Sequence, residues 1–322
     1  MRRGWSLSLV ASLFVATHCD DSPLAAAPPP PPPAPPAPGV PCVVPNGADA
    51  RVRAATPRDG LGCRRYPATL GAPRDVVETR DGEIYVSEMS TGTISRLDGD
   101  IFTVVTSGLL GPIGLREPLA SDGALVVAEE HAHRVSRIDR ATGARTTVDE
   151  GLGNVTYLAI GGDGAAYVSS FSSLTAPTGV IHRVELTGAP RRSTFATELL
   201  VPEGLAFDES GRLAIAEWGR RPSTVSRLAM GGGSIASAER LASGFAALYG
   251  VVRAPRSDGW IVADLDGDRI SQVHENGSVE VLLRDVAAPA GLFVARNGDL
   301  LVAEHVGLGH DARGYLLRIS GL

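Results

Sequence analysis

The chain has 322 residues, a formal net charge of −6 and a sequence pI near 5.7, and all 30 of its Lys+Arg residues are arginine. The absence of lysine excludes Schiff-base enzymes, the P-loop of phosphate-binding ATPases and protein kinases, because each of them needs a primary amine. The acidic balance also argues against a basic binding face, so we expect no nucleic-acid partner.

Residues 1–18 have the pattern of an export signal. Arg2 and Arg3 precede an apolar run from Trp5 to Ala16, which is too short to span a bilayer as a helix. Cys19 follows directly, so the segment resembles a bacterial lipoprotein signal in which Cys19 carries the lipid. Ordinary signal cleavage near residues 25–27 is the alternative. Either way we expect a bacterial extracytoplasmic protein, which is periplasmic, anchored at the outer membrane or secreted.

Residues 19–45 form a proline-rich linker. Twelve prolines lie between Pro23 and Pro45, six of them in a row. Such a run adopts extended polyproline II and predicts a stiff spacer between the domain and an anchor. In an oxidising compartment, Cys42 and Cys63 most simply form a disulfide, and two unpaired thiols are the alternative.

Residues 46–322 form the domain, and from about residue 70 one pattern recurs six times. The pattern is a short strand entered by Pro-x-Gly, a second strand ending in a small and then an acidic residue, and a third strand ending in apolar-x-Arg-apolar, and single repeats depart from it. The strand-end acidic column is Glu88, Glu129, Ser170, Glu217, Asp264 and Glu304, at intervals of 40 to 47 residues. Repeats of this length predict an all-β, six-bladed β-propeller.

The sixth repeat ends after its third strand. Because a propeller has to close its ring, we expect an N-terminal strand to supply the missing outer strand. The alternating Ala-Arg-Val-Arg-Ala of residues 50–54 is the candidate.

The repeat resembles a known family. Residues 122–129, Asp-Gly-Ala-Leu-Val-Val-Ala-Glu, and residues 134–138, Arg-Val-Ser-Arg-Ile, resemble NHL-type repeats and the related senescence-marker-protein/gluconolactonase propellers. The resemblance covers about residues 70–322 and implies the fold. It leaves the activity open, because this superfold hosts lactonases, lyases, receptors and binding modules.

A second column follows the acidic one. Its members are Arg96, Arg137, Arg183, Arg227, Gln272 and Arg318. Glu88 and Arg96, like Glu129 and Arg137, lie eight residues apart around a turn, so we expect cross-strand ion pairs that build the blades.

The middle residue of each Pro-x-Gly triplet is expected to face the mouth of the central channel. Together with neighbouring aromatic residues, this column gives the ligand-binding candidates Arg74, Tyr157, Glu203, Trp218 and Tyr249. Histidines and acids in the loops after the second strands of blades 2 and 6 could hold a divalent cation, namely Ca²⁺, Mg²⁺ or Zn²⁺. The metal candidates are Glu130, His131, His133, Glu203, Glu304 and His305. Plain surface histidines are the alternative.

Two functions therefore compete. The first is an exported, lipid-anchored or free, monomeric propeller that binds a small molecule or a cell-envelope component at its channel face. The second is a metal-dependent hydrolase of the lactonase or esterase kind, or a lyase. Streptogramin lyases, which resemble this repeat type, use His and Glu with Mg²⁺ at the channel mouth. No catalytic residue can be assigned from the sequence.

Overall fold

The computed structural model describes residues 42–45, 52–120, 122–188, 191–218, 222–229, 231–307 and 312–322. The predicted export signal, the lipidation candidate Cys19 and most of the proline-rich linker lie outside the described residues. Within the described residues, no helix is long and apolar enough to cross a membrane.

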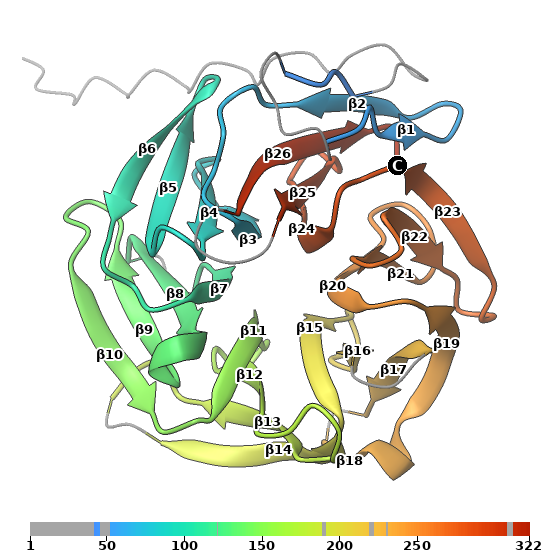
Figure 1. Cartoon of the computed structure of the whole chain (residues 1–322). Helices are drawn as coiled ribbons and strands as arrows, with labels where there is room; N and C mark the ends of the chain where they lie inside the picture. The colour runs from blue at the N-terminus through green and yellow to red at the C-terminus, as the bar shows by residue number, and fades with distance from the viewer. Residues whose placement is uncertain are drawn as a thin grey trace, which may run out of the picture. The chain divides into compact units, whose positions relative to one another are not determined.

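Six sheets surround a central axis as the blades of a propeller (Figure 1), and all their strand pairs are antiparallel except that of β14 with β18. Blade 1 consists of β3 (Pro73–Glu78), β4 (Ile84–Glu88), β5 (Thr93–Asp98) and β6 (Ile101–Thr106). Blade 2 consists of β7 (Pro112–Arg116), β8 (Ala124–Glu129), the short 3-10 helix η1 (Glu130–Ala132), β9 (Arg134–Asp139) and β10 (Arg145–Glu150). Blade 3 consists of β11 (Asn154–Ile160), β12 (Ala166–Phe171), β13 (Gly179–Val184) and β14 (Arg192–Leu199), and β18 (Gly233–Ser234) pairs with β14 in parallel.

The remaining blades follow the same order. Blade 4 consists of β15 (Val201–Phe207), β16 (Leu213–Trp218), β17 (Ser223–Leu228) and β19 (Glu239–Phe245), with the 3-10 helix η2 (Ile235–Ser237) before β19. Blade 5 consists of β20 (Leu248–Arg253), β21 (Trp260–Asp264), β22 (Arg269–Val273) and β23 (Val279–Arg284), with β1 (Thr56–Pro57) at its edge. Blade 6 consists of β24 (Pro289–Val294), β25 (Leu300–Val306), β26 (Arg313–Ser320) and β2 (Gly62–Arg65). The predicted all-β, six-bladed propeller is confirmed.

The N-terminal segment closes the ring, as predicted, but through a different strand. β2 pairs antiparallel with β26, from Gly62 opposite Ser320 to Arg65 opposite Leu317. The expected location at residues 50–54 is wrong, because residues 52–54 belong to no strand. The alternating pattern of these residues arises because Val52 is buried in the core between blades 5 and 6. It does not reflect the hydrogen bonds of a strand ladder.

The disulfide fixes this closing segment. Cys42 and Cys63 are bonded, with their Cα atoms 5.0 Å apart, as predicted. Both side chains are buried in the core that blades 5 and 6 share. The bond therefore ties the chain before β1 to the strand that completes the ring.

The predicted pairing of the acidic column with the arginine column is wrong. Glu88 lies opposite Thr93, and Arg96 lies opposite Tyr85. The turn between the second and third strands is shorter than the prediction assumed. The acids therefore lie at one end of this strand pair and the arginines lie nearer the other end. The arginines pair instead with acids at the other end of the blade, as Arg137 does with Asp122.

The strand-end acids bind the backbone of their own blade. Each accepts an N–H from the segment that leads into the inner strand, for example Leu110 N to Glu129 Oε2 at 2.9 Å. The other pairs are Gly71 with Glu88, Leu200 with Glu217, Ala247 with Asp264 and Ala287 with Glu304. Because these carboxylates fasten the inner strand to its neighbour, the column is structural.

Candidate functional site

The inner strands meet closely around the axis, which sets the shape of the channel. A Cβ atom on Gly250 would lie 2.4 Å from the carbonyl oxygen of Ala290, so glycine is required where one inner strand passes the next. The corresponding position in blade 3 holds Tyr157, which is 1% exposed. Its hydroxyl donates to the carbonyl oxygen of Arg74 in blade 1 at 3.0 Å. Tyr157 therefore reaches from one blade to another and forms a floor in the channel.

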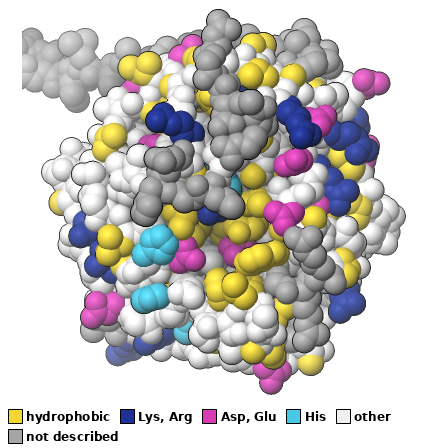
Figure 2. Space-filling view, in the orientation of Figure 1, with side chains coloured by type: hydrophobic (Ala, Val, Ile, Leu, Met, Phe, Trp, Pro, Cys, Tyr) yellow, Lys and Arg dark blue, Asp and Glu magenta, His cyan; other side chains and the backbone are white. Residues whose placement is uncertain are grey.

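Above this floor, residues from several blades form a group that we call the channel mouth: Arg74, Glu130, Glu203, Trp218, Tyr249 and His305. Inner strands β3, β15 and β20 supply Arg74, Glu203 and Tyr249, and β16 and β25 supply Trp218 and His305 near their ends. Figure 2 shows hydrophobic and acidic side chains gathered around the centre of the viewed face, with histidines beside them. Four of the five predicted ligand-binding residues thus belong to the mouth, and the fifth, Tyr157, is its floor.

The guanidinium of Arg74 pairs with the neutral imidazole ring of His305. Arg74 Nη1 lies 3.3 Å from His305 Nε2, and Arg74 Nε lies 3.2 Å from the sulfur of Met89. Burial and the positive charge of Arg74 lower the pKa of His305 to about 3. A neutral ring whose Nε2 accepts from Arg74 carries its proton on Nδ1, which is buried with only a weak contact to the backbone of Gly307.

Glu203 is the most unusual group of the mouth. Its side chain is buried, and its Oε2 atom has no hydrogen-bond partner among the described residues. Burial, and secondly the negative charge of Glu130, raise the pKa of Glu203 well above its ordinary value of 4.5, while Arg74 acts in the opposite direction. The carboxyl group is therefore held in its neutral form, as a hydrogen-bond donor without an acceptor.

Aromatic rings border these groups. The Tyr249 ring lies 5.7 Å from the Arg74 guanidinium and 6.3 Å from the ring of Trp218. Burial raises the pKa of Tyr249 to about 12, so its hydroxyl stays protonated. The mouth thus combines a guanidinium, a neutral carboxyl, a neutral imidazole and two aromatic surfaces.

Three of the predicted metal candidates, Glu130, Glu203 and His305, belong to the channel mouth, but the six candidates do not form one cluster. Among the described residues, no three His, Cys, Asp or Glu side chains converge on a point that could hold a metal ion. Glu304 faces outward to β2, where both its oxygens accept from Arg65 at 2.7 and 2.8 Å. His131 is 60% exposed, and His133 is exposed with its Nδ1 atom 2.9 Å from the carbonyl oxygen of Gly153.

Sequence reasoning missed two features of the described structure. Met89 joins the mouth because, like Trp218 and His305, it directly follows a strand-end acid, and reading that column would have found it. In blade 3, Ser170 replaces the acid and lies 3.0 Å from Nε2 of His182 on β13. Burial lowers the pKa of His182, so this pair is a neutral substitute for the carboxylate of the other blades.

Comparisons with known proteins support the fold. No family model and no curated protein matches the sequence. Among solved structures, a carbohydrate-active enzyme of family AA12 from Trichoderma reesei is 13% identical, with a TM-score of 0.70 over 86% of this chain and 100% of that chain. The PQQ-bound aldose sugar dehydrogenase of Streptomyces coelicolor is 20% identical, with a TM-score of 0.63 over 82% of this chain and 100% of that chain. Regucalcin of Agrobacterium tumefaciens, a calcium-binding protein, is 14% identical, with a TM-score of 0.62 over 79% of this chain and 93% of that chain. The resemblance to gluconolactonase-like propellers is confirmed at the level of the fold.

Proposed function

We propose that the protein binds a small, hydroxyl-bearing molecule at the channel mouth. The observation that carries this proposal is Glu203, whose buried Oε2 atom has no partner. Leaving a buried polar group unpaired costs about 1–3 kcal/mol. A ligand that accepts from the Glu203 carboxyl regains this free energy, so the mouth favours molecules with hydrogen-bonding oxygens.

The chemistry of the mouth narrows the ligand to a sugar, a sugar acid or a lactone. Arg74 offers donors to a carbonyl or carboxylate oxygen, and the Trp218 and Tyr249 rings offer apolar faces against which a sugar ring packs. The names of two structural neighbours agree with this class, since one is an aldose sugar dehydrogenase and another a carbohydrate-active enzyme. Their sequences are too distant to transfer an activity.

Titration calorimetry with D-glucose, D-gluconate and D-glucono-1,5-lactone tests the proposal. We expect at least one of them to bind the full chain, and Arg74→Ala to weaken that binding at least tenfold. His133→Ala is the matched control, because His133 is an exposed residue of the same face outside the mouth. Equal affinity of Arg74→Ala and the wild type, or no binding of any of the three probes, would overturn this reading.

A second candidate is acid–base catalysis at the same mouth, as a hydrolase or lyase. Burial raises the pKa of Glu203, so its carboxyl can give a proton to a leaving group, whereas the Nε2 lone pair of His305 accepts from Arg74 and its pKa near 3 makes this ring a poor base. The donor set does not fit a divalent cation, because Arg74 lies against His305 and Glu304 is bound to Arg65. Lactone or ester turnover that EDTA leaves unchanged and Glu203→Gln abolishes would support this candidate, and an inert wild type would exclude it for those substrates.

We also propose that the protein acts outside the cytoplasm. The Cys42–Cys63 disulfide supports this location, because such bonds persist in oxidising compartments. Fractionation of the producing cells, with globomycin treatment or Cys19→Ser to test lipidation, would separate an anchored from a free form.

A further inference from the structure

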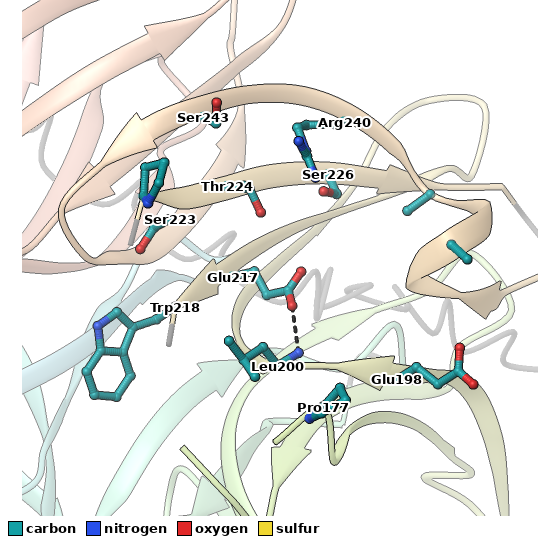
Figure 3. Close-up of a pocket in the computed structure, with 13 residues that line it drawn as sticks. Pro177, Glu198, Leu200, Glu217, Trp218, Ser223, Thr224, Ser226, Arg240 and Ser243 are labelled. Carbon is teal, nitrogen blue, oxygen red and sulfur yellow. Dashed lines mark hydrogen bonds between the residues drawn. The ribbon is translucent and has the colours of Figure 1, made fainter. Parts of the chain in front are cut away.

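A cleft next to the channel mouth is not used by the proposed function. It has a volume of about 850 Å³ and opens between blades 3 and 4 (Figure 3). This volume lies within the roughly 300–1,000 Å³ of small-molecule sites. Figure 3 shows Trp218 at one end and Glu198 at the other, with Glu217 between them. Thr224, Ser226 and Arg240 lie on the opposite wall (Figure 3).

The cleft and the mouth share Trp218. This residue lines the cleft, and its ring centroid lies 6.3 Å from that of Tyr249 in the mouth. A ligand held at Glu203 can therefore extend across the Trp218 ring and enter the cleft without leaving the protein surface.

The walls offer side-chain donors and acceptors. Thr224, Ser226 and Ser243 supply hydroxyl groups, and the guanidinium of Arg240 makes no hydrogen bond or ion pair among the described residues. β14 and β17, which border the cleft, are each paired on both sides, so they offer no free strand edge to a peptide. A ligand is thus recognised through hydroxyls, a guanidinium and an aromatic ring, which suits a polyhydroxylated molecule better than a peptide.

The backbone at the outer end of the cleft is also unusual. Glu198 has a φ of 63°, in the left-handed region that residues other than glycine rarely adopt. Such conformations cluster at binding sites, where the surrounding structure holds them.

From these observations we infer that the cleft is an extension subsite for an oligosaccharide. The first sugar lies in the mouth, as in the proposed function on which this inference rests. The next units pack over Trp218 and lie between β14 and β17, with Arg240 and Thr224 as hydrogen-bonding partners. The ligand is therefore a chain of sugars, of which the mouth holds the end.

Calorimetry with matched pairs of probes tests the chain-length requirement. The pairs are glucose with cellotetraose, N-acetylglucosamine with chitotetraose, and galacturonate with tetragalacturonate. For one pair, the full chain is expected to bind the tetramer at least tenfold more tightly than the monosaccharide. Thr224→Trp, which fills the cleft, and Arg240→Ala should remove this advantage and leave the affinity for the monosaccharide within twofold.

The control is Thr147→Trp, because Thr147 is an exposed residue of β10 on blade 2. Arg240 is itself exposed, so Arg240→Ala decides the question if Thr224→Trp does not fold. Equal affinities for monomer and tetramer in the wild type would overturn this inference and leave the proposed function standing. A tetramer advantage that survives both variants would also overturn it, and so would binding of no sugar of either length, while the proposed function is decided separately with D-gluconate and D-glucono-1,5-lactone.

Discussion

Replacing Glu203 by glutamine should stabilise the protein at neutral pH, although it removes a residue of the binding site. Burial raises the pKa of Glu203 well above 4.5 in the folded state. In the unfolded chain the carboxyl loses its proton near its ordinary pKa, so the folded state is increasingly penalised as the pH rises. The contribution of Glu203 to stability is thus complete below about pH 4.5 and is lost as the pH rises towards its folded-state pKa.

The magnitude follows from the size of this pH interval. Each pH unit above 4.5 costs about 1.4 kcal/mol while the folded carboxyl stays protonated. A loss of that size corresponds to roughly 3–6 °C in Tm per pH unit for a domain of this size. Glutamine has nearly the same shape as a protonated glutamate and can donate a hydrogen bond, but it does not ionise. Glu203→Gln should therefore recover much of this loss of stability.

Thermal unfolding followed by circular dichroism at pH 5, 6, 7 and 8 provides the assay. The difference in Tm between Glu203→Gln and the wild type should be small at pH 5 and grow with pH. Glu209→Gln is the matched control, since the Glu209 side chain is 78% exposed and its replacement should give a nearly constant difference. A difference for Glu203→Gln that stays flat or falls with pH would refute the reasoning that this carboxyl is buried and neutral.

Three further changes test the architecture. Arg65→Ala leaves a buried carboxylate without its counter-charge and should cost about 3–5 kcal/mol in urea unfolding, and Arg65→Lys should restore only part of it, because lysine lacks the two-pronged donor. Reducing the Cys42–Cys63 bond should cost about 3 kcal/mol and add two alkylations by intact mass to any label already carried by Cys19, whereas a label count that reductant leaves unchanged would contradict the bond. Gly250→Ala forces a backbone shift of its blade and should cost about 1–3 kcal/mol, while Gly162→Ala, with open space around it, should be near neutral.

The fold and most of the mouth could be predicted because both depend on local repetition. Three of the six repeats begin their inner strand with Pro-x-Gly and the other three keep the same place in the repeat, so Arg74, Glu203 and Tyr249 could be assigned to one ring of positions. A repeat position at which the residue type changes from blade to blade indicates a binding site from the sequence alone.

The errors concern features that only tertiary structure decides. The pairing of Glu88 with Arg96 failed because the length of one turn sets the register of the whole hairpin. The closing strand was misplaced because residues 52–54 and β2 have equally plausible alternation, and only β2 brings an arginine to Glu304. The cleft could not be predicted, because it depends on β18 leaving its own blade to pair with β14.

The pairing of β2 with β26 also has a consequence for how the protein is made. Blade 6 combines β2 with β24, β25 and β26, so its sheet cannot be completed until β26, the last strand of the ring, has been synthesised. Contacts between such distant segments form slowly, because the chain between them has to be ordered first. The ring therefore stays open until both segments are present, whichever blades have already formed. The same arrangement means that truncation at either end would open the ring.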